Sequence, residues 1–216
     1  MRFIDLSHTV SDGLETYPGL PGPTISDHLS RAASRERYAP GTEFQIGRID
    51  MVANTGTYID TPFHRYADGH DLSALALERV ANVAAVLVDA KGPAVDAGAF
   101  AGLDLADRAV IVRTGWDARW GTAAYGAGGH PHLTAAAARA LVDARVAVVG
   151  IDSVNIDATS TGERPVHTAL LAAGIPIVEH LRGLEQIPSG AFTFTSVPVK
   201  VKGMGTFPVR AFATIA

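Results

Sequence analysis

Three central segments of the chain are continuous short runs of apolar residues, at 83–88, 109–112 and 146–151. Their length and their content of valine and isoleucine are typical of strands that are buried on both faces. Residues 44–52, 192–201 and 207–215 instead show alternating patterns, which predict further strands, and FIDLS at 3–7 predicts a short one. The chain is therefore expected to form a sheet with a buried centre.

Two segments carry helix signals. Thr134 is a good N-cap for the run AAAARALVDA, and a second helix is expected over 166–173, ending at Gly174 with Pro176 preventing continuation. Helices that alternate with buried strands, followed by a strand-rich C-terminal part, indicate a mixed α/β fold rather than a regular βαβ repeat. With 216 residues and no composition shift that marks a linker, one domain spanning 1–216 is expected.

Composition and charge exclude several classes of function. The chain has no cysteine, which excludes a disulfide scaffold, a thiolate zinc site and a cysteine nucleophile. The net charge is −4, with 18 basic and 22 acidic residues and no basic run, so nucleic-acid binding is not expected. No apolar run has the length of a signal peptide core or a membrane span. We expect a cytoplasmic protein with a small-molecule partner and no membrane association.

Residues 54–64, which read NTGTYIDTPFH, form the most informative segment. Gly56 and Pro62 argue against a helix here, so a strand that ends in a turn is expected. Because alternate strand residues share a face, one face would carry Asn54, Gly56, Tyr58 and Asp60, with His64 just beyond the turn. Taken one at a time, each of these polar residues is explained without a functional site, as a turn cap or as part of the core. Grouped on one face, they are costly to bury unless they pair or bind something, which favours a functional site.

This segment resembles the signature of the cyclase family of metal-dependent hydrolases, which includes kynurenine formamidases and isatin hydrolases. The family pattern is His-x-Gly-Thr-His-x-Asp-x-Pro-x-His, and the chain departs from it only where Asn54 and Tyr58 replace the first two histidines. Four further segments resemble the family in the expected order: DLSHTVSDGLETYPG, VRTGWD, VGIDS, and HTALL followed by IPIVE. The resemblance therefore covers nearly the whole chain.

The resemblance implies an α/β single domain with a mixed β-sheet, barrel-like core and flanking helices, of the swivelling β/β/α type. It also implies two adjacent divalent metals. Asp60, His167 and Glu179 match the second metal site, whereas the first site loses two ligands because amide oxygen and protonated phenol are poor ligands for zinc. The sequence thus predicts one divalent metal (Zn or Mn) or none. No nucleotide or flavin is expected, since no P-loop or complete dinucleotide fingerprint follows a strand.

The expected reaction is hydrolysis of a C–N or C–O acyl bond in an aryl formamide, cyclic amide or lactone. His64 would serve as general base or acid, and Tyr58 and Asn54 would donate hydrogen bonds to the oxyanion. Substrate-binding candidates are Arg65, Trp116 and Tyr17. The alternatives are a metal-free lyase, dehydratase or cyclisation enzyme that uses the same pocket, and a non-catalytic binding protein.

Less specific expectations concern assembly and the other histidines. The resemblance favours a homo-oligomer, either a dimer or a tetramer. His130 and His132 are expected to be solvated, and His180 to face away from Glu179 if the strand continues. His8, in the family-like opening segment, is a candidate for the pocket lining.

Overall fold

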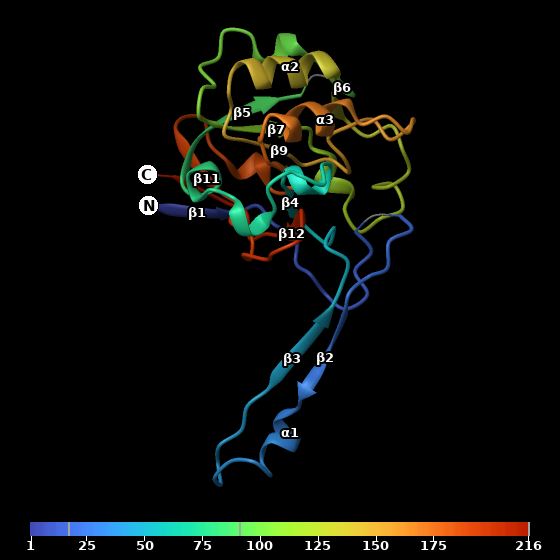
Figure 1. Cartoon of the computed structure of the whole chain (residues 1–216), viewed down its shortest axis with the longest axis vertical. Helices are drawn as coiled ribbons and strands as arrows, with labels where there is room; N and C mark the ends of the chain where they lie inside the picture. The colour runs from blue at the N-terminus through green and yellow to red at the C-terminus, as the bar shows by residue number, and fades with distance from the viewer. Residues whose placement is uncertain (17, 91, 216) are drawn as a thin grey trace.

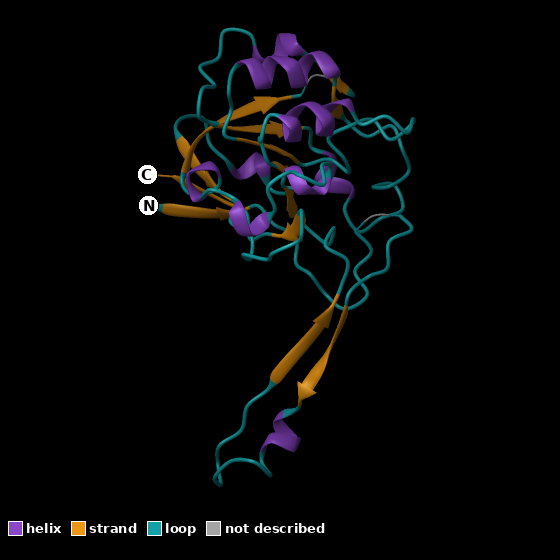
Figure 2. Cartoon of the chain, viewed as in Figure 1, coloured by secondary structure: helices purple, strands orange, loops and turns teal. Residues whose placement is uncertain are grey.

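A nine-stranded mixed sheet forms the body of the protein in the computed structural model, which describes residues 1–16, 18–90 and 92–215 (Figures 1 and 2). Its strand order is β1 (Arg2–Asp5), β13 (Phe212–Ile215), β11 (Phe192–Thr195), β5 (Val83–Asp89), β7 (Ala109–Arg113), β9 (Val148–Ile151), β10 (Ile177–Glu179), β4 (Tyr58–Asp60), β12 (Thr206–Pro208). The neighbours from β5 to β10 run parallel, and all other pairs are antiparallel. The predicted mixed α/β fold is confirmed.

The central strands are buried on both faces, as their continuous apolar runs predict. In β7, Val110 and Val112 belong to an apolar cluster with the helices, whereas Ile111 belongs to a second cluster on the opposite face. That second cluster also includes Ile59 of β4 and Phe194 of β11, which come from opposite parts of the sheet. The sheet therefore curls around this cluster into a half-barrel.

Two helices, α2 (Ala135–Asp143) and α3 (Pro165–Ala172), lie together over the parallel part of the sheet (Figure 1). Thr134 caps α2 as predicted, because its hydroxyl accepts a hydrogen bond from the Ala137 amide at 3.1 Å. The helix α3 begins one residue before the predicted start, since proline is well tolerated in a first turn. Among the described residues, no helix has both the length and the apolar character needed to span a membrane.

Strands β2 (Thr24–Leu29) and β3 (Ile46–Asp50) form a separate antiparallel ribbon that projects from the body, with the short helix α1 (Arg31–Ser34) at its far end (Figures 1 and 2). We call residues 24–50 the arm. Every residue of β3 is exposed, including Ile46 and Ile49. The alternation in 44–52 thus predicts a strand correctly, but the strand lies outside the sheet.

The remaining elements are short. Strands β6 (Ala94–Val95) and β8 (His132–Leu133) pair in parallel. Turns of 3₁₀ helix occur at Pro62–His64, Leu72–Ala74, Leu77–Arg79, Ala97–Phe100, Trp116–Arg119 and Leu184–Gln186. The C-terminal strands are more broken than expected: β11 ends at Thr195, and residues 209–211 separate β12 from β13. Pro198 and Pro208, which lack an amide hydrogen, limit regular pairing in this part.

Candidate functional site

Strands β4 and β10 bring two distant segments of the chain together at the site. They pair antiparallel with Tyr58 opposite Glu179 and Asp60 opposite Ile177. Directly opposite residues share a face, so the phenol and the two carboxylates project on the same side of the sheet. The strand prediction for 54–60 is correct only from Tyr58 onward, because Gly56 has a left-handed φ of 65° and turns the chain before β4.

Asp60, His64 and His167 form a group whose candidate ligand atoms all lie within 4.8 Å of one another. Asp60 Oδ2 is buried without a hydrogen-bond partner among the described residues, and it lies 3.7 Å from His167 Nε2. That separation is too long for a hydrogen bond. It is close to the roughly 3.4 Å between two donors that bind one ion at about 2.1 Å in tetrahedral geometry. The group therefore has the form of a cation site.

His167 is oriented by Asp157, a residue that the sequence patterns did not identify. The imidazole Nδ1 lies 2.7 Å from Asp157 Oδ2, and the same carboxylate accepts the backbone amides of Val166 and His167 at 2.7 and 3.0 Å. Because Nδ1 holds its proton toward Asp157, Nε2 faces Asp60 and is available as a ligand. Although burial opposes it, the bond to Asp157 and the charges of Asp60 and Glu179 raise the pKa of His167 to about 10. A cation would therefore displace a proton there.

His64 lies on the turn Pro62–His64 and is partly exposed, with 37% of its side chain accessible. Thr206 of β12 donates its hydroxyl proton to Asp60 Oδ1, so its oxygen accepts from His64 Nδ1 at 2.8 Å. His64 Nε2 is then the atom left for chemistry. Close packing behind this turn requires a glycine at 205, since a Cβ there would lie 2.2 Å from the His64 amide nitrogen.

Glu179 lies at the inner side of this group and is 1% exposed. Its Oε1 accepts the Ile156 amide at 2.6 Å and lies 3.7 Å from His167 Nε2, while its Oε2 accepts the Tyr58 hydroxyl at 2.7 Å. Burial raises the pKa of Glu179 to about 7. Burial and the charges of Glu179 and Asp60 also raise the pKa of Tyr58. A hydrogen bond from Asn54 lowers this pKa but does not outweigh them, so the phenol stays protonated.

His180 lies beside Tyr58, which corrects the expectation that it faces away from Glu179. Strand β10 ends at Glu179, and His180 adopts a left-handed φ of 55° that breaks the alternation. Its Nε2 lies 3.3 Å from the Tyr58 hydroxyl and its Nδ1 lies 2.7 Å from the Tyr125 hydroxyl. Burial lowers the pKa of His180 to about 3, which keeps the imidazole neutral.

The other histidines near this region are also partly or fully buried. His8 stacks on Trp120 with ring centroids 3.7 Å apart, and its Nε2 is buried without a hydrogen-bond partner among the described residues. His130 was expected to be solvated, but it is only 3% exposed. The glycine-rich loop folds it against Ser153 and Thr159. His132 is half-buried.

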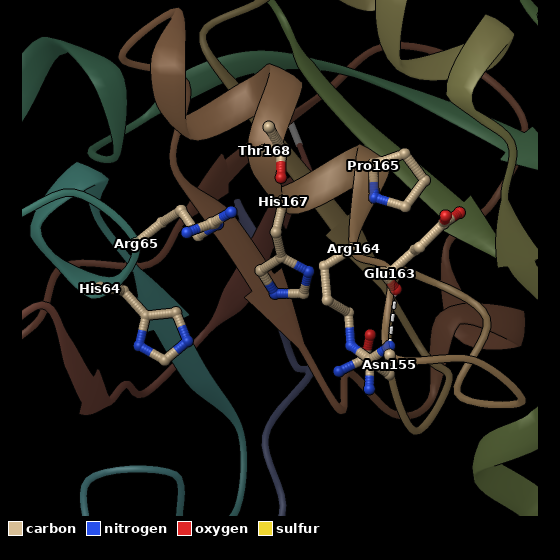
Figure 3. A pocket seen from close by; sticks show the side chains of 9 residues that line it. His64, Arg65, Asn155, Glu163, Arg164, Pro165, His167 and Thr168 are labelled. Atoms are coloured by element: carbon tan, nitrogen blue, oxygen red, sulfur yellow. Dashed lines mark hydrogen bonds between the residues drawn. The ribbon is translucent and has the colours of Figure 1, made fainter.

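His64 and His167 of this group line a cavity of about 520 Å³. Figure 3 shows His64 and His167 on either side of a common space, with Arg65 next to this space and Arg164 on the side of His167 away from His64. Trp116 does not line this cavity; its indole nitrogen donates to the Tyr125 carbonyl at 2.9 Å. Tyr17, the other aromatic candidate, lies outside the described residues.

Comparisons with known proteins show which family and fold the chain resembles. The family described as "Putative cyclase" matches residues 4–158. A kynurenine formamidase from Salinibacter ruber is 28% identical over 98% of this chain and 96% of its own length, and one from Polaromonas naphthalenivorans is 26% identical over 98% and 90%.

Solved structures show the same fold. Isatin hydrolase A from Labrenzia aggregata superposes with a TM-score of 0.81 at 22% identity, covering 98% of this chain and 93% of that one. A structure described as a potential metal-dependent hydrolase with cyclase activity has a TM-score of 0.79 at 24% identity, covering 98% and 96%. The family match spans most of the chain, and the curated relatives match it along nearly its whole length. The chain therefore belongs to the cyclase family.

Proposed function

We propose that this enzyme hydrolyses a C–N or C–O acyl bond of a small molecule, with an amide such as an aryl formamide as the preferred class. The observation that carries the proposal is the group Asp60, His64 and His167, of which the two histidines line an open cavity, with Asp60 Oδ2 buried without a hydrogen-bond partner among the described residues. The relatives named kynurenine formamidase act on an amide bond, which supports the same class here.

One divalent ion, Zn²⁺ or Mn²⁺, fits the residues present. Asp60, His167 and Glu179 would hold it, with His64 within reach of the same space. When bound, such an ion supplies polarisation of the carbonyl and activation of a water molecule. A second ion does not fit beside it, since Tyr58 occupies Glu179 Oε2 with a hydrogen bond and offers a protonated phenol.

His64 is the proposed general base and acid. Thr206 fixes its Nδ1, so Nε2 faces outward to take a proton from water and to return it to the leaving nitrogen or oxygen. Asn54 and Tyr58 are the proposed oxyanion donors. Since the only proton of the Tyr58 hydroxyl is already engaged with Glu179, the Asn54 amide, which has two donor protons, is the stronger candidate of the two.

Arg65 and Arg164 suit a substrate that carries an anionic group. Both line the cavity, and neither forms an ion pair with a carboxylate among the described residues. Arg164 is held by carbonyl oxygens at 158, 161 and 163, so its position is fixed before a ligand arrives. Tyr17 stays proposed as an aromatic contact, whereas Trp116 stays proposed only for a substrate that extends beyond this cavity, which it does not line.

The arm supports the homo-oligomer that the sequence predicts. A two-stranded ribbon is at best marginally stable alone in water, yet this one exposes Ile25, Ile46 and Ile49. A second copy of the chain that packs on both faces of the ribbon would bury them, and we propose a dimer or a tetramer. A single domain over 1–216 and a cytoplasmic location belong to the same proposal.

The test is to measure the metal content of protein purified without chelator, together with turnover of formanilide, a phenyl lactone and an imide. We expect about one Zn or Mn per chain, loss of activity on chelation and recovery when the ion is restored. Asp60→Asn should lose both the ion and the activity. Full hydrolytic activity in metal-free protein would refute the role of the ion, and absence of hydrolysis of all three substrates by metal-loaded protein would favour lyase or cyclisation chemistry by Tyr58, His64 and Glu179.

A further inference from the structure

A chain of side-chain hydrogen bonds leads from Tyr125 through His180 and Tyr58 to Glu179. The three links measure 2.7 Å from the Tyr125 hydroxyl to His180 Nδ1, 3.3 Å from His180 Nε2 to the Tyr58 hydroxyl, and 2.7 Å from that hydroxyl to Glu179 Oε2. All four residues are at most 4% exposed. Water therefore does not compete for these groups, and each bond fixes the next.

The direction of every bond in this chain follows from the number of protons available. When Glu179 is ionised its carboxylate only accepts, so the Tyr58 hydroxyl is the donor in the hydrogen bond between them. At the Tyr58 oxygen, His180 must then be the donor through Nε2–H. A neutral imidazole has one N–H, so Nδ1 accepts from the Tyr125 hydroxyl. The chain thus ends with the Tyr58 hydroxyl donating a hydrogen bond to Glu179 Oε2.

His180 is held in place against a conformational cost. Its φ of 55° lies in the left-handed region, which a histidine adopts only where its surroundings over-determine it. The Thr57 hydroxyl also donates to the His180 carbonyl, at the short distance of 2.6 Å. The strained backbone turns the ring out of the alternation of β10 and toward Tyr58. A side chain held this way in a buried network indicates a specific task rather than space filling.

We infer that the Tyr58 hydroxyl takes the place of a second cation at Glu179, and that His180 and Tyr125 are positioning residues that keep it there. This inference rests on the proposed function. Glu179 Oε2 accepts a hydrogen bond from the Tyr58 hydroxyl where a second ion would otherwise bind, and Oε1 stays directed at His167. The site consequently binds one ion per chain, and its affinity depends on Tyr125 through Tyr58.

The test combines two measurements on the full-length chain and on the variants Tyr125→Phe, Tyr58→Phe and His180→Asn. Asparagine tolerates the left-handed backbone, so His180→Asn should keep the local fold. Its shorter side chain does not reach the Tyr58 hydroxyl, so the hydrogen bond to Tyr58 is lost. In metal-free protein labelled with ¹³Cζ-tyrosine, the Tyr58 resonance is identified by its loss in Tyr58→Phe. We expect that resonance to shift in both Tyr125→Phe and His180→Asn.

Titration with Zn²⁺ alone against a competing chelator gives the second measurement. We expect one equivalent per chain, with an affinity lowered about tenfold by Tyr125→Phe. In the Tyr58→Phe background the same change should alter affinity less than about twofold, because Tyr125 acts only through Tyr58.

Three results would overturn the inference: an unmoved Tyr58 resonance, two zinc ions per wild-type chain, or additive effects in the double variant. Absence of zinc binding by the wild type, with the resonance shifting as expected, would instead refute metal-assisted hydrolysis. It would still support the inference that the hydroxyl, and not a cation, serves Glu179.

Discussion

Replacing Asp157 by asparagine should weaken metal binding although Asp157 is not a proposed ligand. The carboxylate accepts from His167 Nδ1 and from the amides of Val166 and His167, at 2.7, 2.7 and 3.0 Å. An asparagine can accept only through its oxygen, so an NH₂ group faces one or more of these donors. The imidazole is then free to hold its proton on Nε2, the atom that faces Asp60.

The magnitude follows from this change of tautomer and from the lost hydrogen bonds. Partners that orient a metal-binding histidine typically contribute about 10- to 100-fold in affinity, which is about 1.4 to 2.7 kcal/mol. Loss of an acceptor for the α3 amides should lower the free energy of unfolding by about 1 to 3 kcal/mol. The assay is zinc competition at neutral pH, combined with urea unfolding of the metal-free protein.

Asp152→Asn is the matched control. Asp152 is equally buried and accepts the amides of Thr114 and Gly115 at 2.8 Å each, so its replacement also removes hydrogen bonds to a carboxylate. Among the described residues, it forms no hydrogen bond or ion pair with His167. We expect unchanged zinc affinity. Equal zinc affinities in the two variants would refute the argument that Asp157 sets the tautomer of His167.

Three further predictions concern catalysis, pH and assembly. His64→Gln should lower kcat/KM by about 10²- to 10⁴-fold while zinc affinity changes less than threefold; a large affinity loss in competition assays would make His64 a ligand instead. Burial raises the pKa of Asp152 from 3.8 to about 6. Its contribution to stability is thus present below about pH 4 and is lost as pH rises through 6. In urea unfolding, the free energy of unfolding of the wild type relative to Asp152→Asn should therefore fall by about 3 kcal/mol between pH 4 and 8. A difference that stays constant with pH would contradict this. The double change Ile25→Asp/Ile49→Asp on the arm should shift the protein to monomer in sedimentation velocity at micromolar concentration, whereas a wild type that is itself monomeric would refute the oligomer.

The parts of the fold that follow from local pattern were predictable from the sequence. The continuous apolar runs at 83–88, 109–112 and 146–151 correspond to β5, β7 and β9, because burial on both faces leaves no polar alternation. Thr134 and Gly174 mark helix ends through side-chain and backbone chemistry that acts within a few residues. The order of strands in the sheet has no such local signal.

The candidate site was predictable in unequal parts. Asp60 and His64 lie in one short segment, so their grouping follows from strand and turn geometry alone. His167 and Glu179 lie more than a hundred residues away and were assigned by resemblance; the structure brings Nε2 of the one and Oε1 of the other within 3.7 Å. Pairing of β4 with β10 and the position of α3 create that proximity, and no residue spacing encodes either.

The residues that the sequence did not reveal share a physical cause. The prediction for His180 assumed that the strand continues past Glu179, but one left-handed residue reverses the side on which a side chain points. Tyr125 lies in an irregular segment with neither strand nor helix period, so nothing local indicates that its hydroxyl points inward. Replacement of a metal-binding histidine by Tyr58 looks like a loss when the sequence is read alone. In the fold, the Tyr58 hydroxyl serves Glu179 in place of a cation. His180 and Tyr125, which are distant in the sequence, supply the hydrogen bonds that keep the phenol in position as a donor to Glu179.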